Sequence, residues 1–365
     1  MAPLRLLPPI LGLLLAGVMV GCDIGFSEPD SQDRGFPLDD CTISADRLVD
    51  GGVGVDGIPA LSSPSLVAPD APQADYLADS SRVIGLQIDG TALAVPHNIL
   101  WHHEIANLEM GGQRIAVTYC PLTGSSLAFS REAVDGAELG VSGLLLDNNL
   151  VMYDRRTNES LWPQMSRVAA CGPATGTSLE MVPVVEMRWD RWRALYPETR
   201  VVSSETGFSR TYSPAGYPYG NYEVPSNDRL LFEGTPIDRR RPPKERVLAL
   251  PAGSDRGLAL PFGALDQEAP VRVVDVTVDG QDRVVFWSRA AGGAMAFQTD
   301  AAFTVRNGQI VDEATGSVWA VDGRAVEGPR QGERLVPVEN AYVAFWFAWA
   351  AFHPNTDLWT PSSTS

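Results

Sequence analysis

The strongest constraint on the fold is an internal repeat. Residues 112–129, GQRIAVTYCPLTGSSLAF, align without gaps with residues 280–297, GQDRVVFWSRAAGGAMAF, and six of the eighteen positions are identical. Three more pairs of segments follow in the same order along the chain: 154–162 with 312–319, 171–183 with 327–337, and 189–199 with 346–356. Chance similarities do not keep their order over so long a stretch, so the chain contains two related parts.

The repeat predicts an α+β fold built of two homologous lobes. We expect the first lobe over residues 75–224, a linker over 225–242 and a second, degenerate lobe over 243–360. Short runs of β-branched and apolar residues, separated by Gly, Pro and Asp, predict that both lobes are rich in β-strands. Short helices are expected to pack on these strands.

Three stretches predict individual elements. Residues 82–88 and 91–96 are expected to form a hairpin around the turn Asp89-Gly90. Residues 97–110 have apolar residues at helical spacing and predict a helix of about three turns. The apolar run 341–352 is too short to cross a membrane, and its partner in the first lobe is amphipathic, so we expect a buried helix there.

The N-terminal region predicts export. Residues 1–21 have one positive charge and then an apolar run, as in a signal peptide. The sequence Met19-Val20-Gly21-Cys22 resembles a lipobox, which implies cleavage before Cys22 and lipidation of that residue. Residues 22–74 are expected to be the lipid-bearing cysteine and a flexible tether. The protein is therefore expected to be a membrane-anchored lipoprotein on the periplasmic or cell-surface side; an ordinary secretion signal is the alternative.

The charge excludes one class of partner. The chain has 45 Asp and Glu residues against 28 Lys and Arg residues, for a formal net charge of −17. Such a surface repels phosphates, so nucleic acid is not expected as a partner. The membrane, reached through the lipid on Cys22, is the expected partner, and no protein partner is indicated.

Potential metal ligands gather in the first lobe. His103 precedes Cys120 by seventeen residues, and Cys120 aligns with Ser288, so this pair occurs in one lobe only. A thiolate, an imidazole and an acidic neighbour are typical ligands of zinc or copper. The sequence therefore predicts a metal or small-ligand site built from His103 and Cys120 with Glu104 or Asp154.

Two alternatives for Cys120 stay open. It could be the nucleophile of an enzyme, activated by His103 and oriented by Glu104 or Asp154. It could also form a disulfide with Cys171 and leave Cys41 unpaired, because exported cysteines usually pair. In that case the protein would be a non-catalytic envelope scaffold or interaction protein.

Several motifs together resemble the bacterial DUF3179 family, whose function is unknown. They are WHHEIAN (101–107), TYCPLTGSSLAF (118–129), VSGLLLDNNLVMYDRRTNESLWPQ (141–164), GPATG (172–176), PKERVLAL (243–250) and FWFAWAAFHP (345–354). The resemblance covers nearly the whole mature chain and implies a grouping, not an activity. It maps His103 and Glu104 onto the family's WHEI motif. Some members have a second cysteine where this chain has Thr123. That departure argues against a CxxC metal or redox motif in this protein.

Overall fold

A computed structural model describes residues 35–361, apart from residues 39, 215 and 268. Over these residues the protein is mostly β-sheet with a few short helices, as a β-rich α+β fold requires. The α-helices are α1 (His97–His103), α2 (Trp189–Leu195), α3 (Phe262–Asp266) and α4 (Trp346–Phe352). The 3-10 helices are η2 (Ala45–Arg47), η3 (Pro72–Ala74) and η4 (Glu132–Val134). No helix in the described part is long and apolar enough to cross a membrane.

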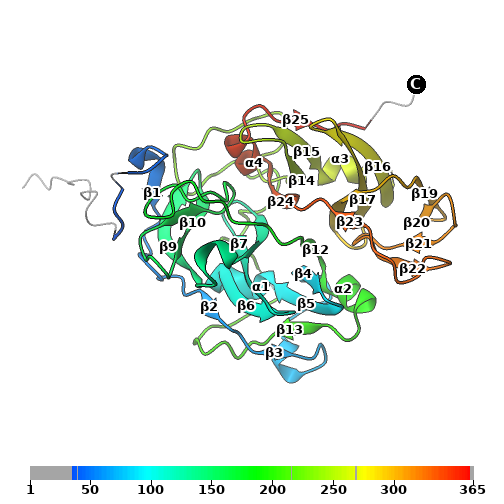
Figure 1. Cartoon of the computed structure of the whole chain (residues 1–365), viewed down its shortest axis with the longest axis horizontal. Helices are drawn as coiled ribbons and strands as arrows, with labels where there is room; N and C mark the ends of the chain where they lie inside the picture. The colour runs from blue at the N-terminus through cyan, green and yellow to red at the C-terminus, as the bar shows by residue number, and fades with distance from the viewer. Residues whose placement is uncertain (1–34, 39, 215, 268, 362–365) are drawn as a thin grey trace, which may run out of the picture.

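The largest sheet joins the first half of the chain (residues 75–224) to the second half (residues 243–360), as Figure 1 shows. Its strands, in spatial order, are β2 (Leu61–Ser62), β6 (Ile105–Met110), β7 (Gln113–Cys120), β8 (Ser125–Ser130), β24 (Tyr342–Phe345), β14 (Arg246–Pro251), β15 (Gly257–Pro261) and β25 (Asp357–Leu358). The halves meet where β8 pairs with β24, at Ser126 and Val343. The two halves therefore share one sheet.

Four smaller sheets complete the fold. One contains β12 (Val185–Arg188), β4 (Arg82–Ile88), β5 (Thr91–Pro96), β13 (Arg200–Val202) and β3 (Leu66–Val67). A second contains β1 (Leu48–Asp50), β9 (Leu139–Leu146), β10 (Asn149–Asp154) and β11 (Leu161–Pro163). The other two contain β16 (Val271–Val278), β17 (Gln281–Ser288), β18 (Gly293–Gln298) and β23 (Val336–Pro337), and β19 (Phe303–Arg306), β20 (Gln309–Asp312), β21 (Val318–Trp319) and β22 (Ala325–Glu327).

Corresponding elements of the two halves pair in the same way. The hairpin β4–β5 is antiparallel to β12 and parallel to β13, and the hairpin β14–β15 is antiparallel to β24 and parallel to β25. The tryptophan of each following helix makes the same bond: Trp192 Nε1 donates to Thr199 Oγ1 over 2.9 Å, and Trp349 Nε1 donates to Thr356 Oγ1 over 2.8 Å. The aligned segments of the sequence therefore have similar local structures.

The predicted hairpin over residues 82–96 is present, whereas the buried helix predicted over residues 341–352 is present only in the second part of that stretch. Asp89 and Gly90 have φ values of 47° and 78°, as a tight turn between β4 and β5 requires. In the second stretch, β24 is followed by α4, and the residues of α4 up to Ala350 are buried. The hydrophobic core around α4 also contains Trp162 and Phe129 of the first half, so this helix is buried by both halves.

The predicted helix over residues 97–110 is wrong in its second part. Helix α1 ends at His103, and residues 105–110 form strand β6, which pairs with β7 along its whole length. The chain reverses at Glu104, whose φ of 55° lies outside the right-handed helical region. The backbone hydrogen bonds to β7 stabilise residues 105–110 as a strand, although the spacing of their apolar residues is typical of a helix.

The expected tether is also corrected where the structure describes it. From Leu48 onward, three short strands, β1, β2 and β3, add to edges of the sheets of the first half. Phe36, Leu38 and Leu48 are buried in a core with Leu144 and Val151. This segment is part of the fold because its apolar residues, though widely spaced, each reach a sheet. Residues 1–34, including the predicted signal peptide and Cys22, lie outside the described residues.

Candidate functional site

The backbone conformation of Glu104 positions the candidate site. This residue follows α1 with φ 55° and ψ −31°, and its N–H still donates to the carbonyl of Leu100 over 2.8 Å. Its own carbonyl accepts from the N–H of Tyr119 over 2.8 Å. A positive φ at a residue other than glycine is strained, and surrounding structure has to hold it. Here the end of α1 and strand β7 hold it.

The Glu104 side chain lies in a small hollow of the first half. The hollow has a volume of about 50 Å³, and its wall includes Leu122, Leu150, Tyr219 and Phe232. Glu104 is 6% exposed, and its carboxyl has no hydrogen-bond or ion-pair partner among the described residues. Burial raises the pKa of Glu104 to about 8, so the carboxyl is mostly protonated at neutral pH.

Cys120 is a neighbour of Glu104 at the end of β7. The thiol is fully buried, and Sγ–H donates to the carbonyl of Asn148 at a distance of 3.6 Å. Burial first, and then the charge of Glu104, raise the pKa of Cys120 to about 11. A nucleophilic cysteine needs a lowered pKa, so the proposed use of Cys120 as an enzymatic nucleophile has no support in this arrangement.

Residues 217–235, which we call the cover, close the hollow from outside. The Tyr222 hydroxyl donates to the Leu122 carbonyl over 2.9 Å. Asn148 holds the other end of the cover, because its side chain donates to the Phe232 carbonyl over 2.9 Å and accepts from the Phe232 N–H over 3.1 Å. Phe232, which lies in the predicted linker, therefore belongs to the wall of the hollow.

Lys244, the chain's single lysine, fixes the middle of the cover. Its Nζ donates to the carbonyl of Arg229 over 2.8 Å and lies 4.1 Å from the centre of the Tyr222 ring. Burial lowers the pKa of Lys244 to about 8. The residue is buried, so it supports the cover from within and does not contact solvent.

His103 does not contact Cys120, although both were predicted to act together. Its Nδ1 lies 2.8 Å from the Pro59 carbonyl, which can only accept, so Nδ1 carries the proton. Its Nε2 then accepts from the Tyr212 hydroxyl over 2.6 Å. Burial lowers the pKa of His103 to about 4, so the ring is neutral. Both nitrogens are occupied, and neither is free for a thiol or a metal.

Asp154 has a structural role. Its carboxylate accepts from the Thr157 N–H over 2.8 Å and from Trp162 Nε1 over 3.0 Å. In the second half, Asp312 accepts in the same way from the Thr315 N–H over 2.8 Å and from Trp319 Nε1 over 3.1 Å. Because Asp154 and Asp312 form equivalent bonds in the two halves, each of them anchors a turn and a tryptophan side chain.

The predicted metal site is therefore corrected. Among the described residues no three His, Cys, Asp or Glu side chains come together so that they could hold a metal ion. His103 and Asp154 are directed to other partners, and only Cys120 and Glu104 share a neighbourhood. The arrangement of these four residues therefore does not support a copper or zinc site.

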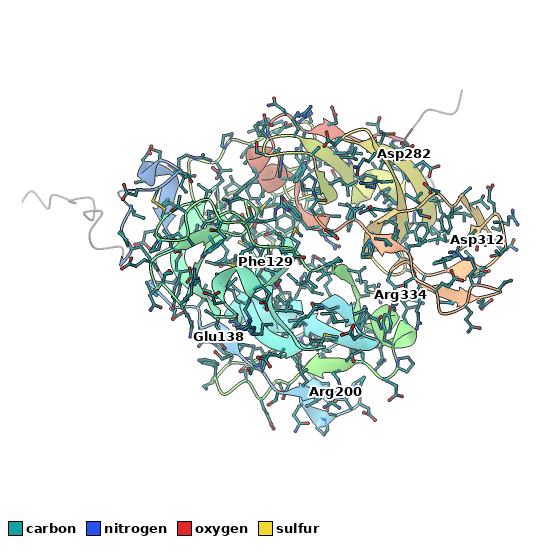
Figure 2. All side chains as sticks on the ribbon, in the orientation of Figure 1. Phe129, Glu138, Arg200, Asp282, Asp312 and Arg334 are labelled. Atoms are coloured by element: carbon teal, nitrogen blue, oxygen red, sulfur yellow. A yellow bond between two sulfur atoms is a disulfide. The ribbon has the colours of Figure 1, made fainter. Side chains whose placement is uncertain are left out.

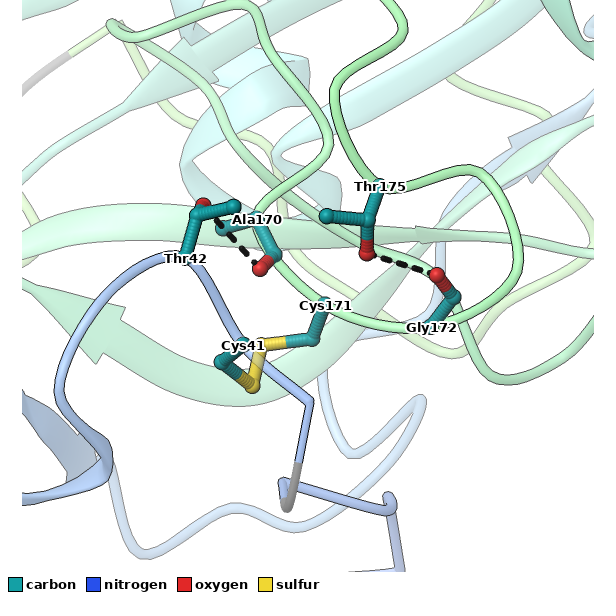
Figure 3. Close-up of a disulfide and its surroundings, with 6 residues drawn as sticks. All are labelled: Cys41, Thr42, Ala170, Cys171, Gly172 and Thr175. Atoms are coloured by element: carbon teal, nitrogen blue, oxygen red, sulfur yellow. Dashed lines mark hydrogen bonds between the residues drawn. A yellow bond between two sulfur atoms is a disulfide. The ribbon is translucent and has the colours of Figure 1, made fainter.

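The predicted disulfide has a different partner. Cys171 is bonded to Cys41, and Cys120 is free. Figure 3 shows the bond beside the hydrogen bond between Thr42 and the Ala170 carbonyl, which holds the two segments together. The pairing of Cys120 with Cys171 is therefore wrong. No local pattern pointed to Cys41 as the partner, because Cys41 lies in the polar stretch that was expected to be a tether.

A buried ionic cluster at the junction of the halves was missed. Glu186 on β12 accepts from the Ser126 hydroxyl over 2.6 Å and is paired with Arg246 of β14. His97 Nε2 lies 3.5 Å from the same carboxylate. Burial opposes ionisation of Glu186, but Arg246, His97 and Arg82 outweigh it and lower its pKa to about 2. The aligned pair Ser126 and Ala294 was a signal that could have pointed here.

The described residues form a β-rich protein whose two halves share a sheet. The chain belongs to the DUF3179 family, described as a protein of unknown function, which it matches over residues 55–356. No curated protein and no solved structure matched the chain.

Proposed function

We propose that this protein is an exported, lipid-anchored envelope protein that binds a small uncharged ligand in the Glu104 hollow. The observation that carries the proposal is a buried carboxyl without a partner, held by a strained backbone against a cavity. Such a combination of cavity, strain and raised pKa is typical of functional sites.

Export is supported by the disulfide between Cys41 and Cys171. Disulfides persist in oxidising compartments and are rare in the cytosol. The anchor rests on the sequence of residues 1–22, which ends in the lipobox-like Met19-Val20-Gly21-Cys22. A Cys22→Ser variant should leave the membrane fraction and appear in the soluble envelope fraction. Retention in the membrane would contradict lipid anchoring at Cys22.

The halves are proposed to have arisen by internal duplication, with the ligand site kept in the first. The shared pairing of the hairpins and the two Asp–Trp bonds support common ancestry. Cys120 and its aligned partner Ser288 both end a strand, yet only Cys120 lies beside a buried carboxyl. The second half then supports the site, because α4 packs in the same core as Cys120.

The chemistry of the hollow defines the ligand class. A protonated Glu104 donates one hydrogen bond, and the rest of the wall is mostly apolar. The ligand group that enters the hollow is therefore small and apolar, with one hydrogen-bond acceptor such as a carbonyl oxygen. An anionic group would lose its hydration without gaining a counter-ion.

A pH-dependent binding experiment tests this proposal. Probes are uncharged amides and ketones of a few heavy atoms, with N-methylacetamide as the first, and binding is followed by ligand-detected NMR. Wild-type protein should bind a probe at pH 6 and release it as the pH rises through about 8, when Glu104 loses its proton. Glu104→Gln keeps a donor and should bind at both pH values, whereas Glu104→Ala should bind weakly at both.

The control is Glu109→Gln, at an exposed position of β6, which should behave as wild type. Absence of binding for every probe, or binding that Glu104→Ala does not change, would contradict a ligand site at Glu104.

A further inference from the structure

A groove lies between the two halves, away from the Glu104 hollow. It consists of two cavities of about 370 Å³ and 530 Å³, which share Gln113, Val182, Pro183 and Pro337 in their walls and therefore adjoin. We call them together the interlobe groove. Figure 2 places the labelled Arg334 at this boundary, where it donates to the Tyr196 hydroxyl of the first half over 2.6 Å.

The floor of the interlobe groove includes several apolar residues. Ile88, Val185 and Leu335 are buried residues of its wall. Val336 of β23 stands at the side of the groove with 58% of its surface exposed, the largest value among the large apolar residues that are exposed. Apolar residues in the floor together with an exposed apolar side chain favour a ligand that also has apolar side chains.

One side of the groove is an extended segment in which a single residue among those described, Met181, has a free backbone N–H and C=O. The Glu180 carbonyl accepts from Ser130 N–H, and Val182 N–H donates to the Ala128 carbonyl, each over 2.9 Å. In this antiparallel arrangement the N–H and C=O of Met181, between them, point away from β8. They make no hydrogen bond within the described residues. These two groups can pair with an added strand.

The rim of the groove is acidic. Asp89, Glu180 and Glu339 are exposed there and have no ion-pair partner among the described residues. The guanidinium of Arg334, which lines the same groove, is already engaged with Asp322 and Tyr196. The unpaired charge at the rim is therefore negative, and it favours a cationic partner.

We propose that the interlobe groove binds an extended segment of another polypeptide in which lysine or arginine residues alternate with apolar residues. Successive side chains of an extended strand point in opposite directions. One set can reach the apolar residues of the floor while the other set reaches the acidic rim. The main chain can pair with the N–H and C=O of Met181.

Fluorescence anisotropy with a labelled nine-residue peptide of alternating valine and lysine tests the proposal on the whole soluble protein carrying Cys22→Ser. The comparison peptide has glutamate at each lysine position. The protein should bind the lysine peptide and not the glutamate peptide. Glu180→Gln together with Glu339→Gln should weaken binding about threefold to tenfold, because two exposed ion pairs are removed.

The matched control removes two acidic residues outside the groove, Glu109→Gln and Asp279→Asn, both exposed. It should change the dissociation constant less than about twofold. The proposal is overturned if no binding occurs at millimolar peptide, if the glutamate peptide binds equally, or if the control pair weakens binding as much as the groove pair. None of these variants touches Glu104, so the result is separate from the test of the ligand site.

Discussion

Trp162 Nε1 donates a 3.0 Å hydrogen bond to Oδ2 of Asp154, and both residues are fully buried. The equivalent bond in the second half joins Trp319 to Asp312 over 3.1 Å. In each half the same carboxylate also binds the backbone of a following threonine. One carboxylate thus fixes both a turn and an indole ring.

Replacing this carboxylate should destabilise either half. Asp154→Ala leaves the Trp162 N–H and the Thr157 N–H without an acceptor, and Asp312→Ala does the same to Trp319 and Thr315. We expect each variant to lose roughly 2 to 4 kcal/mol of unfolding free energy in urea denaturation, because buried donors are left unpaired. If Asp154 were a functional ligand and not an anchor, Asp154→Ala would keep its stability.

The thiols should divide into one bonded pair and one protected thiol. In a Cys22→Ser version, denatured protein should react with iodoacetamide at a single site, Cys120, unless a reductant is present. Native protein at pH 8 should not react, because Cys120 is buried and burial raises its pKa to about 11. Mass spectrometry of the labelled peptides checks both statements. Labelling of Cys41 or Cys171 without reductant would contradict the pairing.

Loss of the disulfide should also lower stability. The bond closes a loop with a sequence separation of 130 residues. Cys41→Ser should lower the unfolding free energy by about 2 to 4 kcal/mol, since the cross-link restricts the unfolded chain. Cys120→Ser is the comparison variant. Any decrease in its unfolding free energy should not depend on added reductant, because Cys120 is not part of the disulfide.

The buried cluster at the junction should give an acid-sensitive stability. The pKa of Glu186 is about 2 in the folded protein, because Arg246 and its neighbours outweigh burial, whereas an unfolded glutamate has its ordinary, higher pKa. The stabilisation by Glu186 is therefore present above pH 4.5 or so and is lost as the pH falls toward 2. Glu186→Gln should be less stable by roughly 3 to 5 kcal/mol at neutral pH, since it leaves the buried Arg246 charge unpaired.

Stability curves of wild type and Glu186→Gln between pH 2.5 and 7 measure this contribution. The two curves should approach one another at the acid end. Parallel curves across the whole range would show that the Glu186 carboxylate does not contribute through its charge.

Much of the local structure could be predicted from the sequence, because the similar segments in the two halves indicated where strands and turns lie. The strands around residues 112–129 and 280–297 coincide with β7–β8 and β17–β18. The turn at Asp89 and the buried helix near Trp346 also follow from local pattern. These features depend on residues that are close in the chain, so spacing and turn residues are enough to identify them.

The parts that were wrong or missed depend on distant contacts. Strand β6 forms because β7 accepts its backbone bonds, although its own apolar spacing suits a helix. Cys41 finds Cys171 across 130 residues. Glu186, Ser126 and Arg246 come from three separate segments and meet only where β8 joins β24. No local pattern indicates such encounters.

Within the candidate site, sequence analysis correctly selected Glu104 and Cys120 as residues of interest, but it assigned them roles that the structure does not support. They were chosen as metal ligands or as parts of a catalytic pair, whereas the structure makes them neutral neighbours beside a hollow. The cover was missed because residues 217–235 have a composition typical of a linker. Its contacts are made by tyrosine hydroxyls and by Asn148, which pair with backbone groups far along the chain.

The central claim is that Glu104 is a protonated donor facing a ligand hollow, and its carboxyl titration tests this most directly. Carbon NMR of glutamate-labelled protein gives the midpoint, with the signal assigned by its loss in Glu104→Gln. We predict a midpoint near pH 8, raised further when N-methylacetamide is added, because a ligand that accepts the proton's hydrogen bond favours the protonated form. A midpoint near 4.5, or one that no probe of this class moves, would contradict the account.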